Sequence, residues 1–115
     1  MITRYEGTGR LSKAVKYNGM IYLSGQVSSG KGKGIQDQTT ETLEKIENLL
    51  EKHGSDKSLI LTALIHLKDM SLFQDMNQIW DAWVQDGFEP ARTCVEGKMA
   101  REDLLVEITV VAAEK

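Results

Sequence analysis

No stretch restricts the backbone of this chain more than Pro90 to Glu96, which holds the only proline and the only cysteine. Pro90 has a fixed φ and disfavours a helical conformation of the residue before it, so a preceding helix must end there. From Ala91 onward the residues alternate in a β-type pattern, in which Arg92, Cys94 and Glu96 share one face. The chain is therefore expected to change from helix to strand at Pro90.

Arg92 stands at the start of this strand and is held by a regular element rather than by a loop. A guanidinium fixed in this way is a two-pronged receptor for a carboxylate. The alternative is an arginine at a strand end that pairs with a surface carboxylate of the same chain. Taken alone, the stretch favours this alternative.

The N-terminal part of the chain carries a strong hairpin signal. Asn18-Gly19 separates two short apolar runs, residues 14–17 and 20–24, and both turn residues tolerate a positive φ. Residues 3–12 have no clear periodicity. They are expected to form a short edge strand or a loop before the hairpin.

Two helices are expected, each with an apolar stripe at helical spacing. The first covers residues 35–52 and the second covers residues 72–85. Ser71 and Gln74 have the spacing of a capping box at the start of the second helix. Asn77 lies within the apolar stripe of that helix, where a polar side chain requires a hydrogen-bond partner. It either bonds a loop or supports a functional site.

Two apolar segments predict further strands. Residues 59–67 are almost continuously apolar, as expected for a central strand covered on both faces. Residues 104–113 alternate, and Glu107 is the only acid inside this otherwise apolar strand. His66 is expected to be a packed or edge histidine rather than a catalyst. Gly25, directly after a strand, predicts close approach of the backbone to another group, unless it marks a simple bulge.

These elements predict an α+β fold: a two-layer sandwich in which a mixed β-sheet carries both helices on one face. Two similar strand-helix-strand passages are expected, with right-handed crossovers. The length of 115 residues suits a single domain, residues 1–115. A domain of this size buries only roughly two-thirds of its surface. The apolar sheet face without helices therefore predicts self-association.

Composition argues against several classes of function. The net charge of −3 gives no reason to expect nucleic acid or an anionic membrane as partner. No apolar run approaches the roughly 20 residues of a membrane span, and the first residues lack the apolar core of a signal peptide. A single cysteine cannot form an internal disulfide, in agreement with a cytoplasmic protein. His53 and His66 show no ligand spacing, so no metal is expected.

Four motifs together resemble the RidA family of YjgF-type proteins. They are Ser24-Gly25-Gln26, the helix around Asn77, the run from Pro90 to Glu96, and Val106-Glu107-Ile108. They follow the family's order with compatible spacing over almost the whole chain, and the Pro-Ala-Arg-x-Cys-Val-Glu run is quite specific. Residues 54–58 and 76–83 are similar to a divergent, YoaB-like branch.

The resemblance implies a fold and an assembly. Proteins of this family have a chorismate-mutase-like α+β fold, also called the endoribonuclease L-PSP fold. They form homotrimers in which the sheets face inward and three clefts lie between the subunits. The resemblance thus implies that residues 1–115 form one RidA-like domain whose partners are two further copies of the chain.

The resemblance also implies an activity without metal or organic cofactor. Such proteins hydrolyse reactive 2-imino and enamine acids, such as 2-aminoacrylate, to 2-keto acids and ammonia. Arg92 would grip the substrate carboxylate, and Glu107 would position or activate water. Backbone groups at Gly25 and Cys94 would line the cleft, and Asn77 would support it. An imine carbon is already electrophilic, so positioning and acid–base catalysis suffice without a covalent nucleophile. Arg92 and Glu107 are both expected on the polar faces of their strands.

One position departs from the family pattern. Active imine deaminases of the family carry a tyrosine in an N-terminal Gly-Pro-Tyr segment, where this chain has Gly9-Arg10-Leu11. Leucine offers no hydroxyl to a substrate or to water. The first expectation is an enzyme that acts on small C=N compounds, and the alternative is a non-catalytic trimer that binds a small carboxylate-bearing metabolite. A ribonuclease or translation-inhibitor role, also attached to relatives, disagrees with the acidic balance and the lack of a basic aromatic patch.

Overall fold

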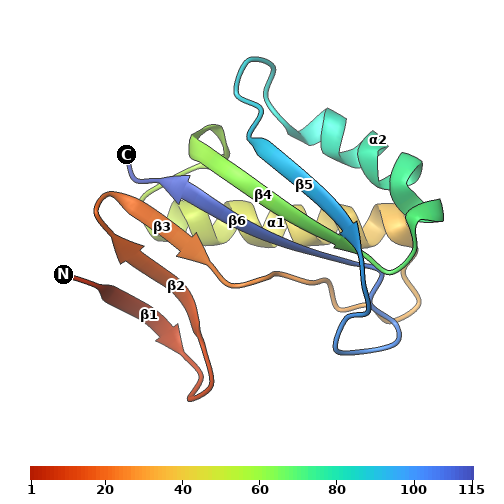
Figure 1. Ribbon diagram of the computed structural model, residues 1–115, viewed down its shortest axis with the longest axis horizontal. Helices are drawn as coiled ribbons and strands as arrows, with labels where there is room; N and C mark the ends of the chain where they lie inside the picture. Colours follow the sequence, from red (N-terminus) through yellow and green to blue (C-terminus); the bar gives the residue numbers. More distant parts are fainter.

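The computed structural model describes residues 1–115, which form a six-stranded sheet with two helices (Figure 1). The strands are β1 (Thr3–Gly7), β2 (Ser12–Tyr17), β3 (Met20–Leu23), β4 (Ile60–Leu67), β5 (Ala91–Glu96) and β6 (Val106–Ala113). The helices are α1 (Ile35–Lys52) and α2 (Phe73–Trp83), and short 3₁₀ helices at Lys57–Leu59 and Met70–Leu72 precede β4 and α2. Neither helix combines the length and the apolar character that a bilayer crossing requires.

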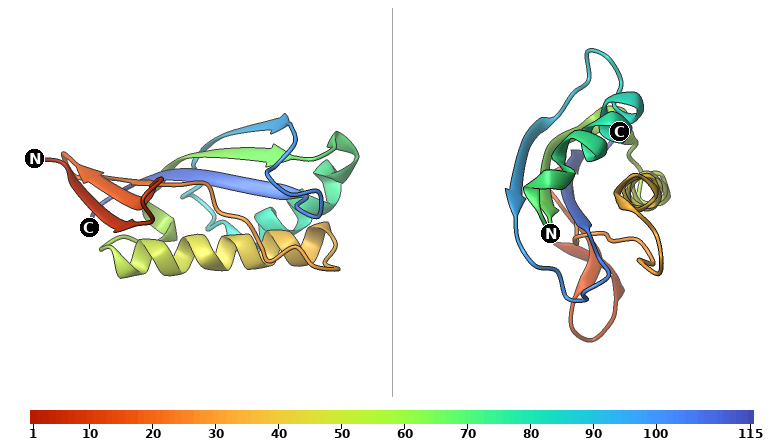
Figure 2. Two further views of the ribbon diagram at one scale, coloured as in Figure 1. Left: turned by 90° about the horizontal axis from the view of Figure 1, so that it is seen from below. Right: turned by 90° about the vertical axis from the view of Figure 1, so that its right-hand side faces the viewer.

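The sheet has the order β1-β2-β3-β6-β4-β5 and is mixed. β4 and β5 run parallel and are joined through α2, whereas every other neighbouring pair is antiparallel. β3 and β4 both pair with β6, which lies between them, and α1 joins these two strands. Both helices cover the same face of the sheet (Figure 2). The predicted α+β sandwich with both helices on one face is confirmed.

The hairpin forms where the sequence predicts it. Asn18 and Gly19 have φ values of 51° and 76°, the left-handed conformation that this tight turn requires. β2 and β3 then pair in antiparallel register from Tyr17 opposite Met20 to Ala14 opposite Leu23. β1 pairs with the outer side of β2 and is an edge strand, one of the two forms expected for this segment.

The hydrophobic core lies between the sheet and the helix layer. Alternate residues of β6 point into it, opposite the apolar stripes of α1 and α2. Its members include Ile21 of β3, Leu43, Ile46 and Leu50 of α1, Met76 and Trp80 of α2, Ile65 and Leu67 of β4, and Val106, Ile108 and Val110 of β6. Burial of one such side chain contributes about 1.5–3 kcal/mol, so packing against the sheet holds both helices in place.

β4 is covered on one face only, so the prediction of cover on both faces is wrong for the single chain. Ala63, Ile65 and Leu67 are buried against the helices, whereas Leu61 and Leu64 are 44% and 37% exposed. Tyr22 of β3 and Val95 of β5 are also exposed on this open face. The continuous apolar character of β4 therefore reflects one packed face and one face that no element of the chain covers.

α2 starts without the predicted capping box. The carboxylate of Asp69 accepts a 2.8 Å hydrogen bond from the backbone N–H of Ser71 and so caps the 3₁₀ helix Met70–Leu72. α2 continues from this turn, and its own first residue has no side-chain cap. Gln74 therefore has no capping role. The preceding 3₁₀ helix already satisfies the first donors.

Candidate functional site

Arg92 lies on the helix-facing side of β5, half-buried between the strand and α2. Its Nη1 donates a 2.8 Å hydrogen bond to Oδ1 of Asn77. Its Cζ lies 5.3 Å from the ring centroid of Trp80 and 5.8 Å from that of Phe73, within the range of cation–π attraction. The strand alternation after Pro90 and the amide of α2 thus fix one guanidinium between two aromatic rings.

No carboxylate of this chain pairs with Arg92. It takes part in none of the salt bridges within 4.0 Å, and its only side-chain hydrogen bond goes to the neutral amide of Asn77. The alternative of an arginine paired with a surface carboxylate of the same chain is therefore wrong. The guanidinium has five N–H donors, so most of them remain for an external acceptor.

Cys94 lies two residues further along the same face of β5. It is half-buried and packs against the hydrophobic core. Burial raises the pKa of its thiol above the ordinary value, and the charge of Arg92 opposes this only in part. Cys94 is therefore a neutral thiol near pH 7 and lacks the lowered pKa of a catalytic thiolate.

Glu107 lies on the open face of the sheet, because its neighbours Val106 and Ile108 point into the core. Gly25 packs directly against it: a Cβ added to Gly25 would lie 3.0 Å from Cδ of Glu107 and closer still to its Oε2. Gln26 and Ile108 exchange backbone hydrogen bonds of 2.9 and 3.1 Å, which hold the segment around Gly25 beside β6. The close approach predicted at Gly25 is confirmed, and the group it meets is Glu107.

His66 is a neighbour of Glu107 that sequence reasoning left out of the site. The two residues stand directly opposite each other in the β4–β6 register. Nδ1 of His66 is buried and has no hydrogen-bond partner, although a buried polar atom usually has one. The sequence feature that could have pointed to His66 is a histidine inside an otherwise apolar strand. Its position beside Glu107 depends on the pairing of strands some forty residues apart.

The structure divides the predicted site residues into two groups. Arg92, Cys94 and Asn77 lie between β5 and α2, whereas Gly25 and Glu107 lie on the open face. The polar side of β5 is turned towards the helices, and the polar side of β6 is turned away from them. Within one chain, the sheet therefore separates Arg92 from Glu107.

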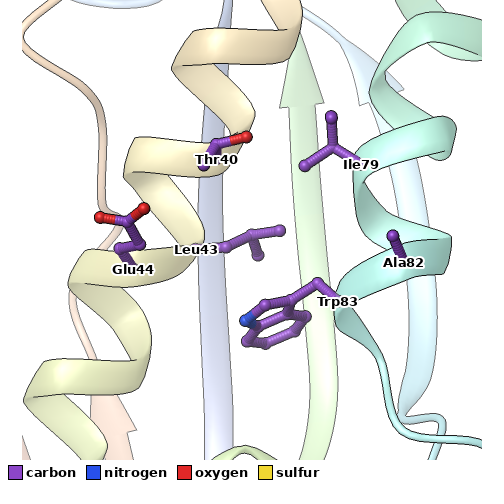
Figure 3. Close-up of a pocket in the computed structure, with 6 residues that line it drawn as sticks. All are labelled: Thr40, Leu43, Glu44, Ile79, Ala82 and Trp83. Atoms are coloured by element: carbon purple, nitrogen blue, oxygen red, sulfur yellow. The ribbon is translucent and has the colours of Figure 1, made fainter.

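None of the three cavities of the single chain is lined by the predicted site residues. The cavity of about 290 Å³ between α1 and α2 is lined by Leu43, Ile79 and Trp83, with Glu44 at its side (Figure 3). The indole Nε1 of Trp83 is already bonded to Oε1 of Glu47 at 2.9 Å. We assign this cavity to the packing of the two helices.

Comparisons with known proteins agree over almost the full length of the chain. The family model described as Endoribonuclease L-PSP matches residues 1–114. A RutC family protein from Haemophilus ducreyi is 39% identical, covering 98% of this chain and 97% of the relative. The RutC family protein YoaB from Escherichia coli is 40% identical over 97% of both chains. A crystal structure of a YjgF family member from Neisseria meningitidis has a TM-score of 0.96 and 43% identity, covering 100% of this chain and 96% of that one.

Proposed function

Since the chain belongs to the endoribonuclease L-PSP family, which includes the RutC, YjgF and RidA proteins, we propose that it hydrolyses reactive 2-imino and enamine acids to 2-keto acids and ammonia. The observation that carries this proposal is the state of Arg92. It is a half-buried cation held by Asn77 and two aromatic rings, and no carboxylate of the chain neutralises it. Such a group is suited to the carboxylate that all these substrates share.

Glu107 supplies the acid–base chemistry in this proposal. The oxygen of a water molecule attacks the imine carbon while the carboxylate of Glu107 accepts a proton from that water. This proton then passes to the nitrogen and gives a carbinolamine, which carries one hydroxyl and one amine on the same carbon. The hydroxyl proton passes to the nitrogen in turn, again through Glu107, so the C–N bond breaks and ammonia leaves as the carbonyl forms. One C=N bond and one water thus become one C=O bond and ammonia. The role of the protein is to orient the substrate through Arg92 and to move this proton.

The two groups would meet between neighbouring chains of a homotrimer. The sheet separates Arg92 from Glu107 within one chain, and no cavity of the single chain contains either of them. The open face that carries Glu107 also exposes Leu64 and Tyr22, an apolar surface suited to contact with another copy. A cleft at that contact would hold the substrate carboxylate on one chain and the water on the other.

The second candidate function is a trimer that binds small carboxylates without catalysis. Leu11 favours it, since this side chain stands where the family's deaminases carry a tyrosine, and it is 49% exposed with no hydroxyl to offer. The carboxylate receptor at Arg92 is the same in both candidates. Release of ammonia from freshly generated 2-aminoacrylate distinguishes them, because only the enzyme accelerates it.

The proposal is tested by separating binding from turnover. Calorimetric titration with pyruvate should show binding to the unaltered protein and none to Arg92→Ala, because each charge-assisted hydrogen bond contributes about 1.5–3 kcal/mol. Arg92→Lys should bind pyruvate little better than Arg92→Ala, since an ammonium cannot donate the two parallel hydrogen bonds of a guanidinium. Glu107→Gln has nearly the same shape, so it should spare pyruvate binding and lower the rate of ammonia release.

These variants are compared after light scattering has shown that they keep the assembly of the unaltered protein. Unchanged pyruvate affinity in Arg92→Ala would refute the carboxylate receptor and with it both candidate functions. Intact binding with no ammonia release by the unaltered protein would refute the deaminase and leave the binding trimer.

A further inference from the structure

The imidazole of His66 carries the one buried side-chain polar atom of the chain that has no hydrogen-bond partner. This atom is Nδ1, and its position is unfavourable because it has lost contact with water without gaining another partner. Nε2 has no partner either but is not buried, so this end of the half-buried ring reaches the surface. A partner for Nδ1 must therefore come from the protein itself.

The pairing of the strands shows which residues surround this ring on the open face. His66 stands opposite Val95 of β5 and opposite Glu107 of β6. A Cβ added to Gly97, beyond the end of β5, would lie 3.8 Å from Cδ2 of His66, so this edge of the ring faces β5. Nδ1 lies across the ring from Cδ2. Glu107, on the other side of His66, is the neighbour with a polar side chain.

Glu107 can reach Nδ1 of His66. Directly opposite residues of an antiparallel pair have Cβ atoms about 4.5–5.5 Å apart, a gap that a glutamate side chain can span. Gly25 lies on the far side of β6 from β4, because Gln26 pairs with Ile108 there. The carboxylate now leans over Gly25, where a Cβ would lie 3.0 Å from its Cδ. Rotation about the side-chain bonds of Glu107 turns it from Gly25 towards His66.

The carboxylate of Glu107 is also free to accept a hydrogen bond. Neither His66 nor Glu107 takes part in any side-chain hydrogen bond or salt bridge of the chain. A half-buried acceptor and a buried ring nitrogen, both without partners, thus stand side by side on adjacent strands.

We propose that His66 is a positioning residue for Glu107, whose carboxylate accepts a hydrogen bond from Nδ1–H of the imidazole. The inference rests on the proposed hydrolysis, in which Glu107 moves the proton. A donor to the carboxylate favours its ionised form and fixes its direction towards the water. In a neutral imidazole a proton on Nδ1 leaves a lone pair on Nε2, which can accept a hydrogen bond from a ligand.

The pairing is tested independently of turnover by NMR of the ring nitrogens in mildly alkaline solution, where imidazoles are neutral. His66 should carry its proton on Nδ1 in the unaltered protein. In Glu107→Ala the proton should move to Nε2, because Nδ1 has lost its acceptor and Nε2 reaches water. Thr109→Ala is the matched control and should not change the tautomer, since Thr109 shares the strand and face of Glu107 but stands opposite Leu64. The spectrum of His66→Phe identifies the signals of His66, because His53 is the only other histidine.

The role in hydrolysis is tested with three substitutions of His66. His66→Phe keeps a flat ring without nitrogen, His66→Asn places an amide N–H near the position of Nδ1, and His66→Gln places one near that of Nε2. The kcat of ammonia release should fall about tenfold or more in His66→Phe and His66→Gln, since a hydrogen bond to a charged group is lost. It should recover to within about threefold in His66→Asn. Pyruvate affinity should stay within about twofold in all three, because Arg92 binds the carboxylate.

The two measurements separate this inference from the proposed function. A proton on Nδ1 that depends on Glu107, in a protein that releases no ammonia, would refute the deaminase and support the pair. A proton on Nε2 in the unaltered protein would overturn the inference, as would an unchanged kcat in His66→Phe. Equal losses in His66→Phe and His66→Asn would overturn it too, since they would assign His66 to packing. Circular dichroism and light scattering establish fold and assembly, and His66→Gln replaces His66→Phe if the latter fails to fold.

Discussion

The residues of the candidate site differ in whether the chain itself supplies their hydrogen-bond and charge partners. Arg92 has an amide and two aromatic rings but no counter-charge, and Nδ1 of His66 is buried with no partner at all. Cys94, in contrast, is a neutral thiol that packs against the hydrophobic core and requires no charged partner. Arg92 and His66, which lack such partners within the chain, are the groups suited to bind a ligand.

Cys94→Ala should therefore keep most of the proposed imine hydrolysis. Burial raises the pKa of the thiol, which disfavours the thiolate that a catalytic nucleophile would need. Rates of ammonia release from the variant and the unaltered protein measure this. A large loss of turnover, with folding and pyruvate binding preserved, would give Cys94 a direct chemical role.

At the scale of elements, the edge hairpin is tied to the end of α1 by one carboxylate. Glu6 of β1 bonds His53, the C-cap residue directly after α1, and forms an ion pair with Lys52 of the last turn of α1. The ring of Tyr5 packs against that of His53 at a centroid distance of 4.8 Å, with the two planes tilted by 46°. β1 pairs with one strand only, so these contacts are its main connection to the helix layer.

This connection should depend on pH. The hydrogen bonds from His53 and then Lys52 lower the pKa of Glu6 below its ordinary value of 4.5. The carboxyl group of Glu6 therefore loses its proton more readily in the folded chain than in the unfolded chain. The contribution of ionised Glu6 to the free energy of unfolding is fully present above about pH 4.5. It is lost as the pH falls through the lowered pKa of the folded form.

Glu6→Gln should remove this part of the acid sensitivity. Urea midpoints measured at pH 7 and again below pH 4 should differ less for the variant than for the unaltered protein. Glu51→Gln is the matched control, because Glu51 is an exposed acid of α1 that joins no salt bridge. An equal change in both variants would contradict the assignment to Glu6.

At the scale of the whole molecule, the dominant feature is a sheet with one bare face. Both helices lie on the other side (Figure 2). Apolar side chains of the central strands, such as Leu64, remain exposed. Contact with further copies would cover this face, and it would also bring the two separated halves of the candidate site together.

The unaltered protein should therefore be a trimer, with a mass by light scattering of three times the 12.9 kDa of one chain. Leu64→Asp should dissociate it at micromolar concentration, because a buried unpaired carboxylate at the contact is costly. Phe88→Asp is the control: Phe88 is an exposed apolar residue too, but it lies in the loop between α2 and β5, outside the strands of the sheet. A monomer mass for the unaltered protein, or equal dissociation of both variants, would contradict the assembly.

The sequence by itself determined the elements, since their signals are local. Asn18-Gly19 fixes the turn by its positive φ values, and helical spacing sets the bounds of α1. Pro90 directly precedes β5, but the expected change from helix to strand at this residue is wrong, because α2 already ends at Trp83 and a loop follows it. Alternation also determined which residues share a face, as it did for Arg92 and Cys94. These effects act between residues a few positions apart, and no distant partner is needed to express them.

Only the tertiary structure decided which way those faces turn. A period of two groups Arg92 with Cys94, but the pairing with β4 and the packing of α2 place them towards the helices and leave Glu107 on the other side. The same long-range pairing set His66 opposite Glu107 and supplied Arg92 with Asn77. These contacts join segments far apart in the chain, so they follow from the order of strands in the sheet and from the free energy of burying one face rather than the other.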